Sequence, residues 1–398
     1  MALTSAEQET VHRALDAFQI ELPSWAFANT GTRFGKFLQA GAATTMAEKL
    51  ADAGQVHRHT GCCPSVATHV LWDFPNGLAD VGAVCAQAEA CGVRIGSVSP
   101  NVFQDQEYKH GSLANPDGAI RARALRHVLD CVEIVGRTGS RDITPWLADG
   151  SNYPGAANIR HRKQWLLENF RAVHNSLRPG QRLLIEYKPF EPAFYHTDIA
   201  DWGMALVLAR SSGPNAKVLV DTGHHYQAQN IEQVVAWLLD DEMLGGFHFN
   251  DRRYADDDLT LGSIYPYQVF RIFHEIHHYA WEKGSQPDIA YMVDQSHNLK
   301  PKTEEMIQTV MTAQELYAKA ALVDHERLTV AQQHAELIDA EEMLKAAFST
   351  DVRAAIEDWR QRRKLPRNPL AAFRESGYLA KISAERAERN RGAGGSYA

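Results

Sequence analysis

The sequence predicts an α/β protein of the (β/α)₈ type, a TIM barrel, with an additional C-terminal helical extension. Short apolar segments with strand character alternate with longer segments whose apolar residues recur every three to four positions. Eight strands in this alternation match the number that closes a parallel sheet into a barrel. The alternative is an open doubly wound sheet, which usually carries a glycine-rich phosphate turn after an early strand. The sequence shows no such turn.

The predicted helices and strands follow one another in a regular order. A first helix runs from its N-cap Ser5 to about Leu22, with Val11 and Leu15 on one apolar stripe, and Pro23 ends it. The eight predicted strands are Ser24–Ala28, Val66–Asp73, Arg94–Val98, Asp142–Leu147, Arg182–Lys188, Lys217–Asp221, Gly245–Asn250 and Ile289–Asp294. The helices predicted between them are Ala79–Cys91, Ala119–Arg137, Arg160–Leu177, Thr197–Ser211, Ile231–Asp240 and Pro266–Trp281.

The chain is predicted to consist of three segments. Residues 1–300 form the predicted barrel domain. Residues 301–388 read as helical and highly charged, and we expect an extension that packs on the barrel or on a neighbouring subunit. Residues 389–398 are basic and then rich in Gly and Ser, which predicts a disordered tail. The helices expected in the extension are Glu304–Ala318, Val330–Ala347 and Asp351–Arg362.

The amino-acid composition limits the kinds of molecule that the protein could bind. The net charge of −8 gives no basic surface for nucleic acid or for an anionic membrane. No apolar run is long enough to span a bilayer, and the first residues lack the pattern of a signal peptide. The five cysteines are odd in number and form no CxxC pair, so we expect reduced thiols in a cytoplasmic protein.

Polar residues gather at the ends of the last four predicted strands. Glu186 and Lys188 are two positions apart and therefore share a face. Asp221, His248 and Asp294 end or nearly end the next three strands. A buried histidine is more often hydrogen-bonded than metal-bound, and an aspartate at a strand end often caps a helix. Four consecutive strands that end this way nevertheless favour a metal site at the barrel mouth.

Ligand counting suggests two such sites. One set comes from four adjacent strand ends: Glu186, Asp221, His248 and Asp294. The other lies in loops beyond the mouth and would be more open to water: His224, Asp256 and Asp258. The alternative for residues 256–258 is a solvated acidic loop. Oxygen-rich ligation with imidazole favours Mn²⁺, Mg²⁺ or Co²⁺ over a structural Zn²⁺ built from thiolates.

Four motifs carry a resemblance to a known family: Glu186-Tyr-Lys-Pro, Val220-Asp-Thr-Gly-His-His, Gly246-Phe-His-Phe-Asn-Asp and Val293-Asp-Gln-Ser-His. They resemble the L-rhamnose isomerase family, within the xylose-isomerase-like barrels, and the resemblance covers residues 25–296. It implies a Mn²⁺-dependent aldose–ketose isomerase that acts on L-rhamnose and often on D-allose, with two ions per subunit. It also implies a homotetramer.

The resemblance also implies roles for single residues. The strand-end set matches the ligands of a structural metal. The loop set matches those of a catalytic metal, with Asp221 as a bridge. Lys188 and His69 match residues that hold or open the sugar, and Asp256 joins them as a catalytic residue. The residues expected to contact the sugar are Trp146, Phe34, His69, Lys188 and Ser296, with Phe34 lent to the neighbouring subunit's site.

The chemistry of the reaction fits these residue types but leaves alternatives open. Lys188 suits a cationic donor to a developing oxyanion, and His69 an acid or base, although it also fits a buried histidine tied to a neighbouring strand. Hydrogen could move between C2 and C1 as a hydride or as a proton through an enediol. The remaining functional alternatives are a keto-sugar epimerase, a metal-dependent phosphodiesterase and a non-catalytic sugar-binding barrel.

Overall fold

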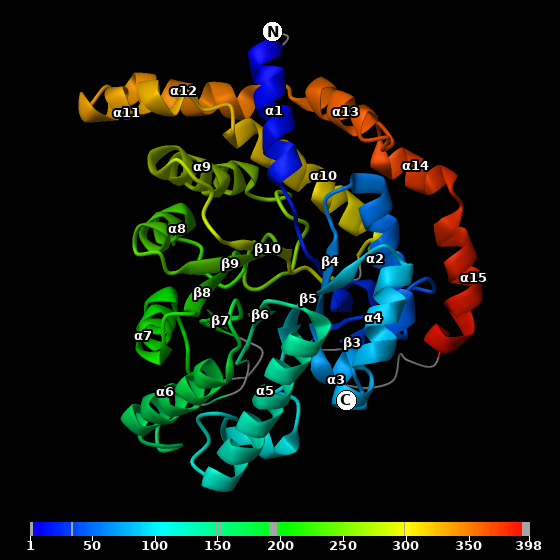
Figure 1. Ribbon diagram of the computed structural model, residues 1–398, viewed down its shortest axis with the longest axis vertical. Coiled ribbons are helices and arrows are strands. Elements are labelled where there is room, and N and C mark those ends of the chain that lie inside the picture. The colour runs from blue at the N-terminus through cyan, green and yellow to red at the C-terminus, as the bar shows by residue number, and fades with distance from the viewer. Residues whose placement is uncertain are drawn as a thin grey trace.

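A closed barrel of parallel strands forms the centre of the molecule. The computed structural model describes residues 3–32, 35–147, 150, 153–190, 197–297 and 299–391. Eight strands lie in the order β1-β4-β5-β6-β7-β8-β9-β10, and a bridge between Glu21 and Met292 joins the two ends of the sheet. The predicted (β/α)₈ fold is therefore confirmed (Figure 1). The strands are β1 (Leu22–Pro23), β4 (Ser65–His69), β5 (Arg94–Ser99), β6 (Asp142–Ile143), β7 (Arg182–Glu186), β8 (Ala216–Asp221), β9 (Leu244–Phe249) and β10 (Ala290–Val293).

Helices surround the barrel and bury their apolar faces on it. In α8, Ile231, Val234, Val235 and Leu238 recur at helical spacing and are all buried. The six helices predicted between strands are present, with ends that differ by up to five residues. The helices around the barrel are α2 (Met46–Thr60), α4 (Val81–Ala90), α5 (Gly118–Thr138), α6 (Ile159–Ser176), α7 (Trp202–Ser212), α8 (Ile231–Asp240), α9 (Pro266–Lys283) and α10 (Lys302–Ala320).

The start of the chain differs from the prediction. The first helix, α1 (Ser5–Ala17), ends before Phe18. The ring of Phe18 packs against that of Tyr317, with the ring centres 4.6 Å apart. The first strand is Leu22–Pro23 rather than Ser24–Ala28, because Glu21 already pairs with β10 and the chain turns after Pro23. Residues Ser24–Phe27 form a 3₁₀ helix instead of a strand.

Helix α2, between the first two barrel strands, was not predicted. Its sequence has a glycine in the middle, and glycine weakens the helical signal. The structure gives a reason for this glycine: a Cβ on Gly54 would lie 2.5 Å from the carbonyl oxygen of Cys91. Gly54 therefore allows α2 to approach the C-terminal end of α4 closely.

After the first strand, the second and fourth predicted strands are shortened the most. The second ends at His69, because the chain turns into the short helix α3 (Val70–Asp73), where the Asp73 carboxylate accepts a hydrogen bond from the His69 backbone N–H at 2.9 Å. The fourth is reduced to the two residues of β6. After the first strand the chain forms a small antiparallel pair, β2 (Gly31–Thr32) and β3 (Gly35–Lys36).

The helices after α10 form an extension that curves along one side of the barrel (Figure 1), whereas α10, which was expected in the extension, packs against α2 and α9. The single helix expected at Val330–Ala347 is two helices, separated near Ala335, whose φ is 58°. The last helix continues to Arg391, so the first three residues of the expected tail are helical, and residues 392–398 lie outside the described part. These helices are α11 (His325–Gln333), α12 (Leu337–Ser349), α13 (Arg353–Arg362), α14 (Pro369–Glu375) and α15 (Tyr378–Arg391).

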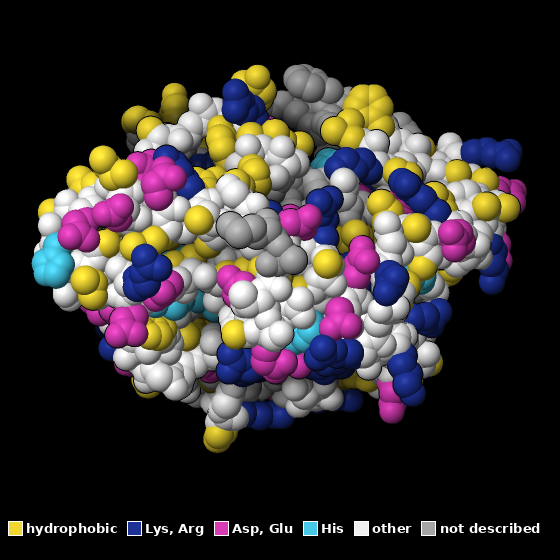
Figure 2. Space-filling view, turned by 90° about the horizontal axis from the view of Figure 1, so that it is seen from above, with side chains coloured by type: hydrophobic (Ala, Val, Ile, Leu, Met, Phe, Trp, Pro, Cys, Tyr) yellow, Lys and Arg dark blue, Asp and Glu magenta, His cyan; other side chains and the backbone are white. Residues whose placement is uncertain are grey.

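Surface and thiol features agree with the composition. Lys and Arg side chains are interspersed with Asp and Glu over the face shown in Figure 2. Among the described residues, no helix has the length and apolar character needed to cross a bilayer. All five cysteines lie in the described part of the chain and are free thiols.

Candidate metal centre at the barrel mouth

The carboxyl ends of the strands open into a cavity of about 500 Å³. Strand ends from both halves of the barrel contribute to its wall, as expected for a parallel barrel in which all strands point the same way. Its lining combines ionisable side chains with aromatic rings. The sequence-predicted site residues on its wall are His69, Trp146, Glu186, His224, His248, Asp256, Asp258, Asp294 and Ser296.

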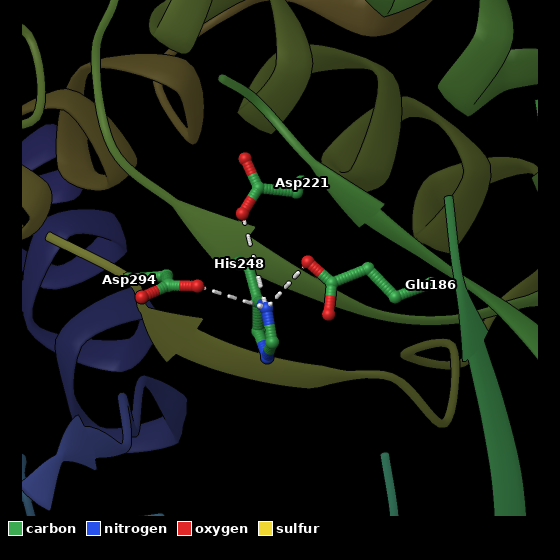
Figure 3. A group of neighbouring side chains, drawn as sticks. All are labelled: Glu186, Asp221, His248 and Asp294. Atoms are coloured by element: carbon green, nitrogen blue, oxygen red, sulfur yellow. Dashed lines mark hydrogen bonds and ion pairs between the residues drawn. The ribbon is translucent and has the colours of Figure 1, made fainter. Parts of the chain in front are cut away.

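Four of these strand-end side chains converge (Figure 3). The Nδ1 atom of His248 lies 3.2 Å from Glu186 Oε1, 3.3 Å from Asp294 Oδ2 and 3.8 Å from Asp221 Oδ2. The four residues each offer one ligand atom within 4.8 Å of the others. Three are buried, whereas the Asp294 side chain is 21% exposed. One oxygen-rich group with a single imidazole therefore stands at the ends of β7 to β10.

A second group shares one residue with the first. Asp221, His224 and Asp256 also offer ligand atoms within 4.8 Å of one another. His224 Nε2 lies 3.4 Å from Asp256 Oδ2 and 3.9 Å from Asp221 Oδ2. Because the same Asp221 Oδ2 atom lies near His248 and near His224, this oxygen is placed between the two groups.

The donor set fits cations. Asp221 Oδ2 is buried and has no hydrogen-bond partner within the described part of the chain. Burial and the nearby carboxylates of Asp294, Asp256 and Glu186 outweigh the charge of His224 and raise the pKa of Asp221 to about 7. So many buried carboxylates are unfavourable unless positive charge compensates them. A pair of divalent ions would supply that charge to oxygen and imidazole ligands.

Hydrogen bonds from outside the two groups orient the ligands. Trp25 Nε1 donates to Asp294 Oδ1 at 2.8 Å, and Asn250 Nδ2 donates to Asp221 Oδ1 at 3.0 Å. His224 Nδ1 lies 2.9 Å from the Tyr187 carbonyl oxygen and donates to it, so Nε2 is the ring nitrogen that faces the second group. The sequence analysis missed Trp25 and Asn250 as site residues. Asn250 lies two positions after His248, and this spacing was its only signal.

Lys188 lies beside the second group. It is buried and forms an ion pair with Asp256 Oδ2, and its Nζ lies 5.2 Å from the centre of the Trp146 ring. Burial opposes the charge of the ammonium, but the Asp256 carboxylate outweighs it and raises the pKa of Lys188. Lys188 is therefore a cation held beside Asp256 and Trp146, both of which line the cavity.

His69 lies in an aromatic part of the cavity wall. Its ring centre is 4.3 Å from that of Trp72 and 4.9 Å from that of Trp25. Burial lowers the pKa of His69 to about 4 against the attraction of Asp73 and Asp294, so the imidazole is neutral near pH 7. Its Nδ1 atom is buried and has no hydrogen-bond partner among the residues that the structure describes. The imidazole therefore has a free position for a proton or a ligand.

One further expectation changes in the structure, and another falls outside the described residues. Asp258 is not among the residues that converge in the second group; its Oδ2 atom accepts a hydrogen bond from Ser296 Oγ at 2.9 Å. Its φ of 50° is unusual for a residue other than glycine, and such backbone conformations concentrate at functional sites. Both Asp258 and Ser296 still line the cavity. Phe34 lies outside the described residues.

A buried ion pair behind the mouth was not predicted. Lys49, on α2, pairs with Asp73 at 2.7 Å, and Ser24 Oγ donates to the same carboxylate at 2.5 Å. Lys49 lines the cavity, and Asp73 also holds the His69 backbone. This network connects α2 to the turn that presents His69. Its members are far apart in the sequence, so no local pattern marks them.

Comparisons agree with a sugar-isomerase type of barrel. The chain belongs to the xylose isomerase-like TIM barrel family, which it matches over residues 45–293. It is 38% identical over 400 residues to a probable sugar isomerase of Rhizobium meliloti, covering 99% of this chain and 92% of that one. It is 36% identical over 392 residues to a probable sugar isomerase of Mesorhizobium japonicum, covering 97% and 90%.

The fold is also that of solved barrels with little sequence similarity. A D-psicose 3-epimerase from Clostridium cellulolyticum H10 superposes with a TM-score of 0.54 at 12% identity, covering 75% of this chain and 99% of that chain. At this identity the likeness concerns the fold alone.

Proposed function

We propose that the protein is a metal-dependent aldose–ketose isomerase that interconverts L-rhamnose and L-rhamnulose, and D-allose and its ketose. The observation that carries the proposal is the pair of ligand groups that share Asp221 Oδ2 beside the buried cation of Lys188. The names of the two relatives and the four motifs support an isomerase. We propose two divalent ions per chain, Mn²⁺ first, with Co²⁺, Mg²⁺ and Zn²⁺ as alternatives.

The strand-end group would hold one ion and Asp221, His224 and Asp256 the other. Such ions, when bound, polarise the carbonyl and hydroxyl oxygens of a sugar as Lewis acids. The chain supplies the rest. Lys188 presents a preorganised cation to an oxygen that gains negative charge, and the cavity wall excludes water from it. Trp146 and Trp72 offer aromatic faces to the carbon–hydrogen face of a sugar.

His69 is suited to ring opening. A neutral imidazole with an unpartnered nitrogen among the described residues accepts a proton, so the structure favours the base role over the acid role left open by the sequence. Ring opening would move the proton of the anomeric hydroxyl to His69 while the bond between C1 and the ring oxygen breaks and the C1 carbonyl forms. The ring oxygen then takes a proton, which the protonated imidazole can return. Asp73 fixes the His69 backbone through its N–H, and the rings of Trp25 and Trp72 fix the imidazole.

The test is product formation from a panel of aldoses. Protein treated with a chelator is assayed for ketose formation from L-rhamnose, D-allose and D-xylose, with and without added Mn²⁺. We expect ketose from L-rhamnose only after Mn²⁺ is restored. The same samples are given the corresponding ketoses. A change of configuration at C3 without any aldose would instead identify a keto-sugar epimerase and contradict the proposal.

We also propose a homotetramer, in which Phe34 of one subunit reaches the cavity of another. The support is the motif resemblance. Light scattering on the purified protein measures the mass, and a monomer would contradict this part of the proposal. Substitution Phe34→Ala should then raise the KM for L-rhamnose more than it lowers kcat, because an aromatic wall contributes binding rather than chemistry.

A further inference from the structure

Three histidines from two helices meet on the outer side of the barrel. His274 and His278 are four residues apart on α9 and therefore lie on one face of that helix. His325 is the first residue of α11, a helix of the extension that lies next to the barrel helix α9 (Figure 1). Their ring centres are 5.2, 5.5 and 5.7 Å apart, pair by pair. None of these residues belongs to the cavity at the mouth.

Two of the nitrogen atoms already have the spacing of metal ligands. His278 Nδ1 and His325 Nδ1 are 3.3 Å apart. Two nitrogens that each lie about 2.0–2.1 Å from Zn²⁺ at a tetrahedral angle are separated by about 3.3 Å. On the same geometry, the ring centres of three imidazoles around one ion are about 5 Å apart, which is close to the observed triangle.

The surroundings also suit ligation. His278 Nε2 lies 3.4 Å from the carboxylate of Glu282, and metal-bound histidines commonly donate their second N–H to such a carboxylate. His274 Nδ1 is buried and without a hydrogen-bond partner in the described part of the chain. The ring of His274 is stacked on that of His325, so it must turn about its side-chain bonds to direct a nitrogen between the other two.

Two of the three imidazoles, those of His274 and His325, are neutral near pH 7. Burial and the proximity of the other imidazoles lower the pKa of His274 well below its usual range, and burial lowers the pKa of His325 to about 4. Neutral imidazoles are the form that binds metals. The nearby cation, Arg271, is paired with Glu275 at 3.7 Å. His277 is not part of the cluster, because its Nε2 lies 3.3 Å from the Tyr317 carbonyl oxygen.

We propose that His274, His278 and His325 form a separate site for one divalent transition-metal ion, such as Zn²⁺, which joins α11 of the extension to α9 of the barrel. Imidazole ligands select ions of this class over Mg²⁺ or Mn²⁺, for which the mouth is built from carboxylates. The fourth position stays open to water on the solvent side, where the His278 side chain is 19% exposed.

The test counts bound zinc in matched variants. Full-length protein is stripped with a chelator, equilibrated with Zn²⁺ in micromolar excess, freed of unbound ion and analysed for zinc per chain. We expect His325→Gln to bind one ion fewer than the wild type. His334→Gln is the control, because His334 is an exposed histidine at the other end of the same helix, and it should bind as many ions as the wild type.

A second single variant provides the same test if the first variant does not fold. His278→Gln should also lose one ion, and the double variant His278→Gln/His325→Gln should lose one and not two, because both residues would serve one site. Circular dichroism checks that each variant is folded, and His278→Gln decides the question if His325→Gln is not. Isomerase activity with Mn²⁺ should be retained.

Three results would overturn the proposal. One is equal zinc content in the wild type and both single variants. Another is an equal loss in His334→Gln, which would mean adventitious binding to surface histidines only. The third is a loss of two ions in the double variant.

Discussion

Among single residues, Asp221 connects the two ligand groups at the carboxyl ends of the barrel strands. One of its carboxylate oxygens is held by Gly223 N at 2.6 Å and Asn250 Nδ2 at 3.0 Å, so the other, Oδ2, is fixed between His248 and His224. From the sequence, the loop site was expected to be more open to water than the strand-end site. The structure corrects this contrast, because the Asp294 side chain is 21% exposed and that of Asp256 is 12% exposed.

The shared position of Asp221 gives a prediction about stoichiometry. Asp221→Asn should lower the metal content by about two ions per chain, because the substitution weakens both groups. Asp256→Asn should lower it by about one, because it removes a ligand from the second group alone. Elemental analysis of the dialysed variants measures both. An Asp221→Asn protein that keeps one tightly bound ion would show that the groups do not share this ligand.

At the scale of elements, α15 is fixed to α2 by a buried ion pair. Arg386 donates to both carboxylate oxygens of Asp52, at 2.7 and 3.0 Å, and both side chains are almost fully buried. Tyr378 OH also donates to Asp52 at 2.7 Å. The same helix reaches the mouth side of the barrel, since Asn390 contacts Asn29 at 2.9 Å. The extension therefore supports the wall from which Lys49 reaches the cavity.

Removing this ion pair should destabilise the protein. Arg386→Ala leaves the Asp52 carboxylate buried without its cation, which typically costs about 3–5 kcal/mol. Lys381→Ala is the matched control, because Lys381 is an exposed residue of the same helix whose pair with Glu385 is long at 4.0 Å, and such pairs contribute less than about 1 kcal/mol. Urea unfolding compares the two variants. Equal unfolding free energies would contradict the assignment of α15 as a structural support.

Helix α9 gives a prediction for the dependence of stability on pH. Burial lowers the pKa of His277 to about 4, from 6.5 for a free histidine. Between these values the unfolded chain binds a proton that the folded protein does not, so the free energy of unfolding falls as the pH falls from 6.5 to 4. Above pH 6.5 this contribution is fully present.

The effect can be measured with His277→Gln. A glutamine amide can replace the hydrogen bond to the Tyr317 carbonyl but does not titrate. The loss of unfolding free energy between pH 7 and pH 4.5 should therefore be smaller in the variant than in the wild type. Buried histidines that do not interact with His277 titrate alike in both proteins and cancel in the comparison, whereas His274 and His325 interact with it. An identical pH dependence of the two proteins would show that the pKa of His277 is the same in the folded protein as in the unfolded chain.

For the molecule as a whole, the helices and strands that follow from the local sequence pattern could be predicted. The features that depend on contacts between residues distant in the sequence could not. Strand alternation placed Glu186 and Lys188 on one face, and the parallel barrel brought the ends of β7 to β10 together. The short β1 depends on its pairing with β10, and α2 depends on the space left by Gly54. Trp25 is 269 residues from its partner Asp294, so its contact has no local signature.

The central claim is that two divalent ions at the Asp221 mouth carry the isomerisation. The most direct test is to strip the protein with a chelator, restore Mn²⁺ in steps, and measure bound Mn²⁺ per chain and L-rhamnulose formation in the same samples. We predict no activity in the stripped protein and full activity only when about two ions are bound per chain. Full activity in protein shown by elemental analysis to be metal-free would contradict it.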